Sequence, residues 1–407
     1  MGFPKRILAF ALAAVSAFSI CGCGKEKNKP DDGAEGTAKD RAAYIEHLNE
    51  KYADYKEVEY GLDITKKTDL VGICYSTWFS QIRYRQKKDP PNISEILAGN
   101  GDWGNEGQFH YWAKPALGYY LSDDKEVVRT HMTQIAEAGI DYIIIDNTNA
   151  QIVWKDEKRG SANTNWSLYV TDPCTVILDT IVEMRTEGKK APYVVFWSAA
   201  GVCADGADRG WDVVNATYDE FISQDKWKDC FVYWEGKPFM LLTGMPGGSP
   251  NADMTLKVQW GLVDNSIPGR WSFLDKNNIP MYDTDGFVEQ TCVCVAAQET
   301  YMSHTATAKG RNHGKTFYEQ WVNAFEYRPK CITLTWWNEW CAQLLFDENG
   351  VRRFTDNYNE EYSRDIEPME GGHGDMYYQW TKQYVAAYKN LEKCPVLIEP
   401  GYEYLLD

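Results

Sequence analysis

The chain has 407 residues, and its 44% hydrophobic and 14% aromatic content is enough to bury a large core. A net charge of −17 repels nucleic acid phosphates, so we expect no nucleic-acid partner. Histidine is scarce, with six residues, and no serine or cysteine triad is recognisable, which argues against esterase, protease and zinc chemistry. We expect no metal and no cofactor, and carboxylates as the reacting groups.

The first 22 residues have the pattern of an export signal. Lys5 and Arg6 precede an apolar run over 7–20, which is too short to cross a bilayer and typical of a signal-peptide core. The run ends in the letters ICGC, where a small residue directly precedes Cys23. An ordinary secretory signal is the alternative. We predict cleavage after residue 22 and lipid attachment to Cys23, which anchors the protein at the cell envelope.

A tether and a helix are predicted to follow the signal. Residues 23–40 are almost wholly polar, so they cannot bury enough surface to offset the cost of ordering and should be flexible. Residues 38–56 are partly amphipathic and predict a lead-in helix. The remaining chain, residues 41–407, is expected to form one domain and a monomer.

Short apolar runs rich in β-branched and aromatic residues predict strands. Several are continuous rather than alternating, as in strands that are buried on both faces. One run is split by Glu235-Gly236-Lys237-Pro238, as in a hairpin turn. The runs are 70–75, 116–120, 142–146, 192–197, 231–242, 271–274, 287–295 and 331–337.

Helical patterns alternate with these runs. Apolar residues recur at helical spacing over 128–136, 177–184, 317–325 and 377–391, and Gly139 and Gly188 end the first two. Strand–helix alternation predicts a parallel sheet, and about eight strands fit a single (β/α)8 TIM-type barrel. An open doubly wound sheet is the alternative, but no G-x-G-x-x-G supports nucleotide binding.

In such a barrel, chemistry takes place at the carboxyl ends of the strands. The run 331–337 continues into Asn338, Glu339 and Trp340, so that Glu339 would lie among three indoles. Partial desolvation there favours a protonated acid, which suits acid–base catalysis, whereas a structural salt bridge is the alternative. Asn338 would bind a sugar hydroxyl or orient Glu339.

Other strand ends supply further candidates. Asp146 is a second catalytic candidate, with a turn or helix-cap role as its alternative, and Glu289 within an apolar run is a third. Sugar contacts are expected from strand ends and from the loop over 304–315. Those residues are Tyr75, Trp78, Asn147, Trp197, Arg311, His313 and Trp337. The acid-rich segment 347–365 lacks the ligand spacing of a calcium loop, which favours a solvated surface.

Besides Cys21 in the predicted signal peptide and Cys23, which would carry the lipid, the chain has nine cysteines. Nine is an odd number, their spacings are irregular, and no C-x-x-C pair occurs. This pattern fits neither a zinc site nor a disulfide framework. Cys292 and Cys294 lie two residues apart and should share one face of a strand. We expect mostly buried free thiols, with one or two disulfides as the alternative.

The order of these motifs resembles glycoside hydrolase family 99 and the related family 71. The motifs are W-x-x-P-x-L-G-Y-Y over 112–120, A-G-I-D-Y over 138–142, E-G-K-P over 235–238 and W-N-E-W over 337–340. The resemblance covers about 70–389. It implies a (β/α)8 barrel and an endo-acting α-mannosidase or α-mannanase.

This chain departs from the family pattern within the strongest motif. The family sequence is Asn-Glu-Trp-His-Glu, in which one glutamate removes the proton of the sugar's own 2-hydroxyl and the other is the acid/base. Asn338 and Glu339 match, but Cys341 and Ala342 replace the last two residues. Either another carboxylate supplies the acid, or the chain acts on a different sugar, or it only binds.

We therefore expect a glycoside hydrolase that cleaves a poly- or oligosaccharide at the cell envelope. One alternative is a catalytically inactive barrel that binds glycan for an uptake system. Another is a scaffold without a sugar site.

Overall fold

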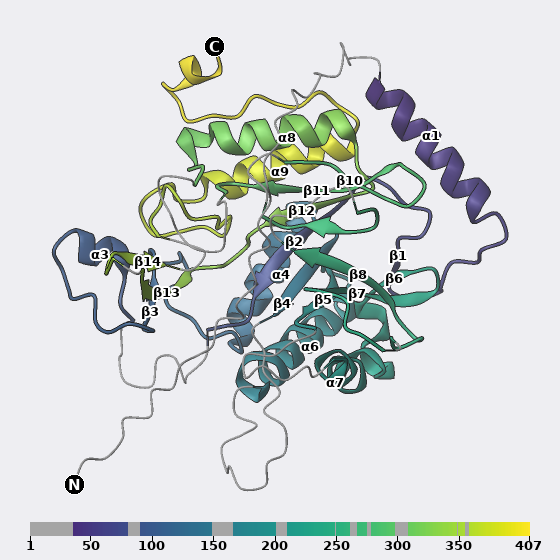
Figure 1. Ribbon diagram of the computed structural model, residues 1–407, viewed down its shortest axis with the longest axis horizontal. Coiled ribbons are helices and arrows are strands. Elements are labelled where there is room, and N and C mark those ends of the chain that lie inside the picture. The colour runs from purple at the N-terminus through teal and green to yellow at the C-terminus, as the bar shows by residue number, and fades with distance from the viewer. Residues whose placement is uncertain are drawn as a thin grey trace, which may run out of the picture.

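The computed structural model describes residues 36–79, 90–148, 166–200, 210–248, 250–260, 267–274, 278–297, 308–347, 349–354 and 358–407 (Figure 1). The predicted signal peptide, Cys23, most of the predicted tether and Cys203 lie outside these residues.

Helices and strands alternate along most of the described chain. The helices are α1 (Gly36–Lys51), α3 (Ile93–Leu97), α4 (Lys125–Glu137), α6 (Asp172–Thr186), α7 (Asp212–Thr217), α8 (Lys315–Tyr327) and α9 (Met376–Lys389). Short π or 3-10 turns span Ser167–Thr171, Tyr218–Ile222, Asp225–Cys230, Asn312–Gly314 and Glu403–Leu406. The strands are β1 (Leu62–Asp63), β2 (Leu70–Ser76), β3 (Phe109–Tyr111), β4 (Tyr142–Asn147), β5 (Tyr193–Ser198), β6 (Val232–Trp234), β7 (Lys237–Leu242), β8 (Thr255–Trp260), β9 (Trp271–Ser272), β10 (Met281–Tyr282), β11 (Val288–Cys294), β12 (Cys331–Thr335), β13 (Cys341–Phe346) and β14 (Arg352–Phe354).

The main sheet is largely parallel, as predicted. Its strands are hydrogen-bonded in the order β11, β12, β2, β4, β5, β7, β8 and β9, and each neighbouring pair is parallel. In the described part of the chain this ladder ends at β9 and β11. Gln290 of β11 bridges the two ends, because its side chain accepts from the Ser272 N–H at 3.0 Å and donates to the Ser272 carbonyl at 2.8 Å. Two further strands pair antiparallel with this ladder, β10 with β11 and β6 with β7, and closure of the strands into a barrel stays a prediction.

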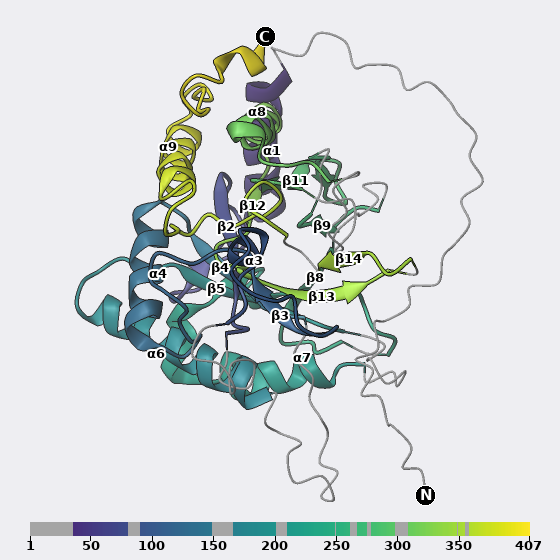
Figure 2. The same ribbon diagram turned by 90° about the vertical axis from the view of Figure 1, so that its left-hand side faces the viewer.

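Helices cover the outer face of the parallel strands. In Figures 1 and 2, α4 and α6 lie next to each other, as do α8 and α9. Apolar residues of these helices form one core with outward-facing residues of the strands, including Ile73 and Ile143. Asp124 caps α4 by accepting from two backbone N–H groups, and Gly139 follows that helix with φ 75°. The predicted helix spacing and the predicted stop at Gly139 are both confirmed.

A second apolar cluster fills the inner side of the strands. It contains Cys74, Ile144, Trp197, Trp271 and Trp336, which come from strands far apart in the sequence. Side chains of a strand alternate between its faces, so each strand contributes to this cluster and to the outer core in turn. Because both faces of these strands are buried against apolar residues, the strands appear in the sequence as long apolar runs.

Two parts of the strand prediction differ from the structure. Residues 116–120 form a turn rather than a strand, because Gly118 takes a positive φ of 79°. The small antiparallel sheet of β14, β13 and β3 was not predicted, nor was β8. In Figure 1 this small sheet and α3 lie at the end of the strands opposite α1.

Helix α1 packs at the amino ends of the strands. Arg41 pairs with Asp69, directly before β2, and Tyr44 stacks on Phe287, directly before β11, at 4.7 Å between ring centroids. Lys51 binds Asp285 at 2.6 Å. The predicted lead-in helix is confirmed, although it ends earlier than expected.

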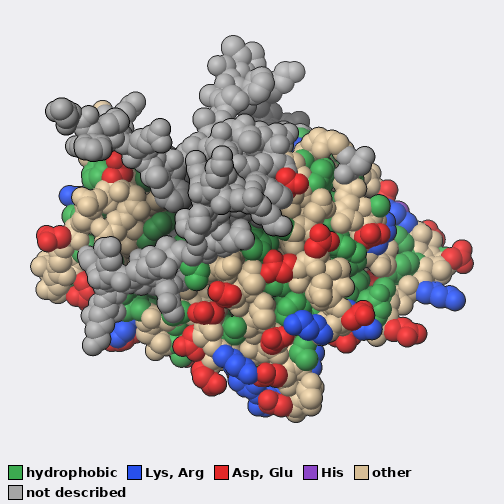
Figure 3. Space-filling model, turned by 90° about the horizontal axis from the view of Figure 1, so that it is seen from below, with side chains coloured by type: hydrophobic (Ala, Val, Ile, Leu, Met, Phe, Trp, Pro, Cys, Tyr) green, Lys and Arg blue, Asp and Glu red, His purple; other side chains and the backbone are tan. Residues whose placement is uncertain are grey.

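Three smaller observations bear on the predictions. None of the helices within the described ranges is both long and apolar enough to span a bilayer. No disulfide joins any two of the eight cysteines that the structure describes, and all of them but Cys394 are buried. Figure 3 shows basic side chains lying among acidic ones on one face, which offers a polyanion no continuous basic track there.

Candidate active site at the carboxyl ends of the strands

The strand ends bring Asp146, Trp197 and Asn338 together. Ser76 of β2 is in register with Asp146 of β4, which is in register with Trp197 of β5. Asn338 joins this row because its Oδ1 accepts from the Ser76 N–H at 2.8 Å and its Nδ2 donates to the Ser76 carbonyl at 3.1 Å. Glu339 follows directly in the chain. The amide of Asn338 therefore ties the start of the Glu339 segment to the end of β2, whereas its role in orienting Glu339 or binding a sugar hydroxyl stays a prediction.

Glu339 forms a buried ion pair with Arg364. The Arg364 Nη2 donates to Glu339 Oε2, and the two side chains are 0% and 2% exposed. The guanidinium carbon of Arg364 also lies 5.2 Å from the centre of the Trp336 ring. This buried ion pair is the structural salt bridge that was the alternative role for Glu339, and its role as a catalytic acid stays a prediction. Arg364 was missed because nothing near it in sequence signals this contact.

Asp146 is the second carboxylate at the carboxyl ends of the strands. It is 3% exposed, and its Oδ1 accepts from the Thr148 N–H at 2.8 Å, which is the turn geometry weighed as its alternative role. Burial raises the pKa of the Cys74 thiol well above its usual range, and the charges of Asp146 and Glu339 raise it further. Both carboxylates therefore raise the pKa of the same buried thiol.

Aromatic rings line the same interior. Trp197 lies 4.6 Å from Phe273 and 6.1 Å from Trp336, between ring centroids. The Trp197 indole N–H donates to the Gln259 carbonyl at 3.1 Å, which fixes that ring. Trp78 is 8% exposed and donates to the Asp146 carbonyl at 3.2 Å. Trp197 and Trp78 are thus near the carboxylates, but both are largely buried in this state.

Three predicted sugar contacts lie on the opposite face of their strands. The hydroxyl of Tyr75 is 2.9 Å from His131 Nδ1, and the Trp337 ring packs edge-on against His131 at 5.7 Å. Asn147 lies beside Cys174 in α6, where its side chain lowers the pKa of that thiol while burial raises it. Each of these residues neighbours an inward-facing one, so pleating turns its side chain to the helices. The expectation that Tyr75, Asn147 and Trp337 contact a sugar is corrected accordingly. Trp336, which was not among the predicted contacts, faces the interior instead.

Glu289 also lies away from the carboxyl ends of the strands. It lies at the amino end of β11, where it binds Lys257 at 2.8 Å and accepts from the Trp271 indole N–H at 2.6 Å. These contacts satisfy a buried carboxylate locally. Glu289 is consequently left out of the candidate site.

The two candidates from the 304–315 loop have structural partners. Arg311 is buried and donates to the Ser363 hydroxyl at 3.1 Å and the Asp365 carbonyl at 2.9 Å. His313 Nδ1 lies 2.8 Å from Glu399, and its ring stacks on Tyr402 at 3.5 Å. Arg311 therefore supports the segment that carries Arg364, and His313 belongs to the contact with the carboxyl-terminal residues.

Two buried carboxylates behind the candidate site were not foreseen. Trp112 and Trp340 stack at 4.8 Å, and their indole N–H groups donate to Asp365 and Glu367, respectively. Glu367 also lies 2.9 Å from His131 Nε2. The expectation of a solvated surface over 347–365 is wrong at its end, because Asp365 is 0% exposed. Partners from distant segments, which a local pattern cannot reveal, hold these carboxylates inside.

Asp365 predicts a pH-dependent contribution to stability. Burial raises its pKa to about 7, although Trp112 and the charge of Arg311 favour the ionised form. The folded state thus retains a proton that the unfolded state loses near pH 4, so this contribution is complete below about pH 4 and is lost as pH rises through about 7. Relative to the parent, Asp365→Asn should become more stable between pH 5 and pH 8, as measured by urea unfolding. The exposed Asp253→Asn control should show no such change, and a flat difference for Asp365→Asn would contradict the prediction.

Ala342 occupies the position of the second family glutamate. It is fully buried in β13, in register with His110 of β3. No carboxylate is supplied from this position. Within the described ranges, no group of three or more candidate ligands could hold a metal ion.

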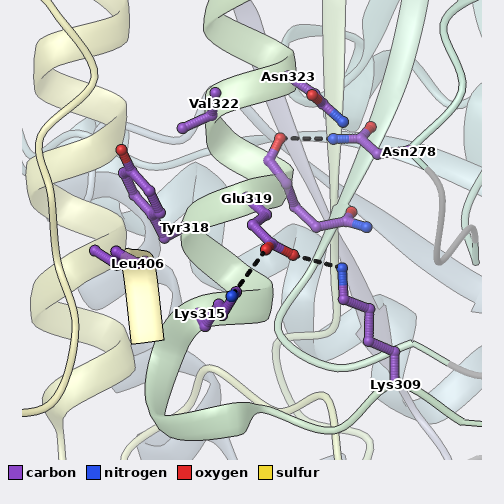
Figure 4. A pocket seen from close by; sticks show the side chains of 9 residues that line it. Asn278, Lys309, Lys315, Tyr318, Glu319, Val322, Asn323 and Leu406 are labelled. Atoms are coloured by element: carbon purple, nitrogen blue, oxygen red, sulfur yellow. Dashed lines mark hydrogen bonds and ion pairs between the residues drawn. The ribbon is translucent and has the colours of Figure 1, made fainter. Parts of the chain in front are cut away.

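A surface pocket of about 540 Å³ lies elsewhere, between α8 and the carboxyl-terminal turn (Figure 4). Lys309 and Lys315 line it, and both pair with Glu319, at 2.7 and 3.8 Å. Lys315 also donates to the Leu405 carbonyl at 2.6 Å. Because these charges are already paired, we assign the pocket no chemistry.

Comparison with known proteins gives a distant structural likeness. No protein-family model and no curated protein matches the chain. A solved structure of the GH99 endo-alpha-mannosidase from Bacteroides thetaiotaomicron has 13% sequence identity and a TM-score of 0.49, with 80% of this chain and 99% of that chain covered. The same enzyme in complex with BIS-TRIS-propane has 12% identity and a TM-score of 0.47, with 79% and 98% covered.

A structure described as a glycoside hydrolase-like protein is similar at 11% identity and a TM-score of 0.42, with 81% of this chain and 97% of that chain covered. At such identities neither a substrate nor a catalytic residue passes from one chain to the other. The chain is thus distantly similar to GH99 endo-alpha-mannosidases and to a glycoside hydrolase-like protein, and its chemistry has to be argued from its own residues.

Proposed function

We propose that this protein is a glycoside hydrolase that cleaves a poly- or oligosaccharide within its chain. The observation that supports this most is the pair of buried carboxylates, Glu339 and Asp146, at one edge of a parallel sheet beside Trp336 and Trp197. Two carboxyl groups are what hydrolysis of a glycosidic bond normally needs. We further propose that the parallel strands close into a (β/α)8 barrel, whose open end is formed by the carboxyl ends of the strands.

The two carboxylates differ in their surroundings, which suggests different roles. Arg364 favours the ionised form of Glu339, so we assign Glu339 the role of base or nucleophile. Asp146 is then the proton donor to the leaving glycosidic oxygen. With Glu339 as the base, water adds to the anomeric carbon while the bond from that carbon to the leaving oxygen breaks. Asp146 gives its proton to the leaving oxygen, and Glu339 takes a proton from the water. By the family resemblance, a glutamate of the Asn338-Glu339 motif would instead take the proton of the sugar's 2-hydroxyl or act as the acid/base.

A glycan-binding protein without catalytic activity is the second candidate. The same ion pair favours it, because Arg364 neutralises Glu339 and Ala342 contributes no acid. Such a protein would hold saccharide for an uptake system. It differs from the enzyme in one measurable respect, which is that bound glycan is recovered intact.

A screen for cleavage tests the proposal. Purified protein is incubated with yeast mannan, starch, xylan, mixed-linkage β-glucan and α-1,3-glucan, and new reducing ends and product lengths are measured. Release of oligosaccharides from at least one polymer is expected for an endo-acting enzyme. Binding without product would support the second candidate, and neither binding nor product would reject both.

We also propose that the protein is a monomer anchored at the cell envelope through lipid on Cys23. The pattern ICGC at residues 20–23 is the support for this proposal. Cys23→Ala should move the protein from the membrane fraction to the soluble fraction or leave it unprocessed. Cys394→Ala is the matched control, because Cys394 lies within the folded domain. A variant that fractionates and migrates like the parent would reject lipid attachment at this residue.

A further inference from the structure

Trp260, the last residue of β8, is unusually exposed. Its exposed fraction is 41%, which makes it the most exposed tryptophan in the part of the chain that the structure describes. Four tryptophans of the inner cluster, Trp197, Trp234, Trp271 and Trp336, are at most 6% exposed. An exposed indole at the carboxyl end of a parallel strand is therefore not explained by packing of the core.

The indole of Trp260 is held by other rings. It lies 6.3 Å from Trp197 and 5.8 Å from Phe273, with interplanar angles of 64° in both cases. Such edge-on contacts leave a ring face unstacked by these two neighbours. The backbone beside it is also fixed, because the Gln259 carbonyl accepts from the Trp197 indole N–H. The ring is thus supported in place before any ligand arrives.

Trp260 is connected to Glu339 through the same aromatic cluster. Phe273, which contacts Trp260, lies 5.6 Å from Trp336, and Trp336 lies 5.2 Å from the guanidinium carbon of Arg364. Arg364 in turn binds Glu339. Trp260 is therefore on the same side of the sheet ends as the carboxylates, with intervening rings between them.

We propose that Trp260 is the stacking platform of a sugar subsite that is separate from the carboxylates. An indole offers a flat apolar surface, and the C–H face of a pyranose ring is its natural complement. A subsite set apart from Glu339 binds a sugar other than the one that is cleaved, so the ligand is a neutral oligo- or polysaccharide chain. This inference rests on the proposed glycan function and specifies the ligand as a chain.

Affinity electrophoresis tests the subsite with the five polysaccharides named above, each embedded in a native gel. Parent protein should be retarded by at least one polymer. Trp260→Ala and Trp260→Leu should bind that polymer about three- to tenfold more weakly, whereas Trp260→Phe should recover most of the loss. Tyr404→Ala, which removes another exposed aromatic ring at 64% exposure, should bind like the parent. Near-ultraviolet circular dichroism checks that the variants are folded.

The outcomes separate this inference from the proposed function. If the parent binds and Trp260→Ala binds equally well, the subsite is rejected while the glycan function stands. If the parent neither binds nor cleaves any polymer, both are rejected. Sedimentation velocity tests whether a second copy of the chain, rather than a glycan, contacts Trp260. If the parent is a dimer and Trp260→Ala is a monomer, the ring is a contact between copies and the subsite is rejected.

Discussion

Replacing Glu339 with glutamine is expected to reduce turnover of the cleaved glycan by about 10²–10⁴-fold. Glutamine keeps the shape and the hydrogen-bond acceptor that faces Arg364, but it cannot take a proton or attack the anomeric carbon. Initial rates on the polymer identified by the screen give the effect, and retardation in a gel of the same polymer should be largely retained. Glu370→Gln, on an exposed glutamate that binds Lys114, is the control and should keep parental rates.

Asp146→Asn belongs in the same experiment, because the proposed mechanism needs both groups. If Glu339→Gln and Asp146→Asn both cleave at the parental rate, the active site lies elsewhere. If Asp146→Asn alone is inactive, Asp146 carries the chemistry and Glu339 is the structural partner of Arg364. Loss of activity in both variants, with binding retained, is the expected result.

Replacing Arg364 with methionine is expected to lower the free energy of unfolding by about 3–5 kcal/mol. The substitution leaves the Glu339 carboxylate buried without its countercharge, and burial of an unpaired charge is costly. Urea unfolding of the parent and the variant at pH 7 gives the difference directly.

The double variant Arg364→Met with Glu339→Gln separates charge from packing. It removes both charges, so its stability should lie well above that of Arg364→Met alone. Equal losses in the single and double variants would show that Arg364 stabilises the fold through packing on Trp336 rather than through the ion pair. A positive coupling energy would support Arg364 as the residue that keeps Glu339 charged.

Much of the parallel sheet could be predicted from local sequence, for a physical reason. Strands β2, β4 and β12 are buried on both faces, so they read as unbroken apolar runs. Strand β8 was missed because its sequence, TLKVQW, carries polar residues that find partners inside, such as Lys257 with Glu289. A local pattern cannot distinguish a paired lysine from a solvated one.

The candidate site was predicted in outline, but its partners were not. Glu339 and Asp146 stood out because each follows an apolar strand, and the fold brings such ends together. Arg364 could not be inferred, because the segment around it looks like an acidic surface and is buried by contacts with distant residues such as Trp336, Arg311 and Trp112. These partners are the reason that we propose Glu339 as a base or nucleophile rather than as the acid.

The docking of α1 on the amino ends of the strands has a consequence for how the molecule would stand on a membrane. Arg41, Tyr44 and Lys51 hold this helix at the end of the sheet opposite the small sheet of β3, β13 and β14 (Figure 1). A chain tethered through its amino terminus would therefore enter the domain from the side away from Glu339 and Trp260. If the anchoring proposed above holds, the point of attachment and the carboxyl ends of the strands lie on opposite sides of the domain, so a tethered chain would not have to cross the candidate site.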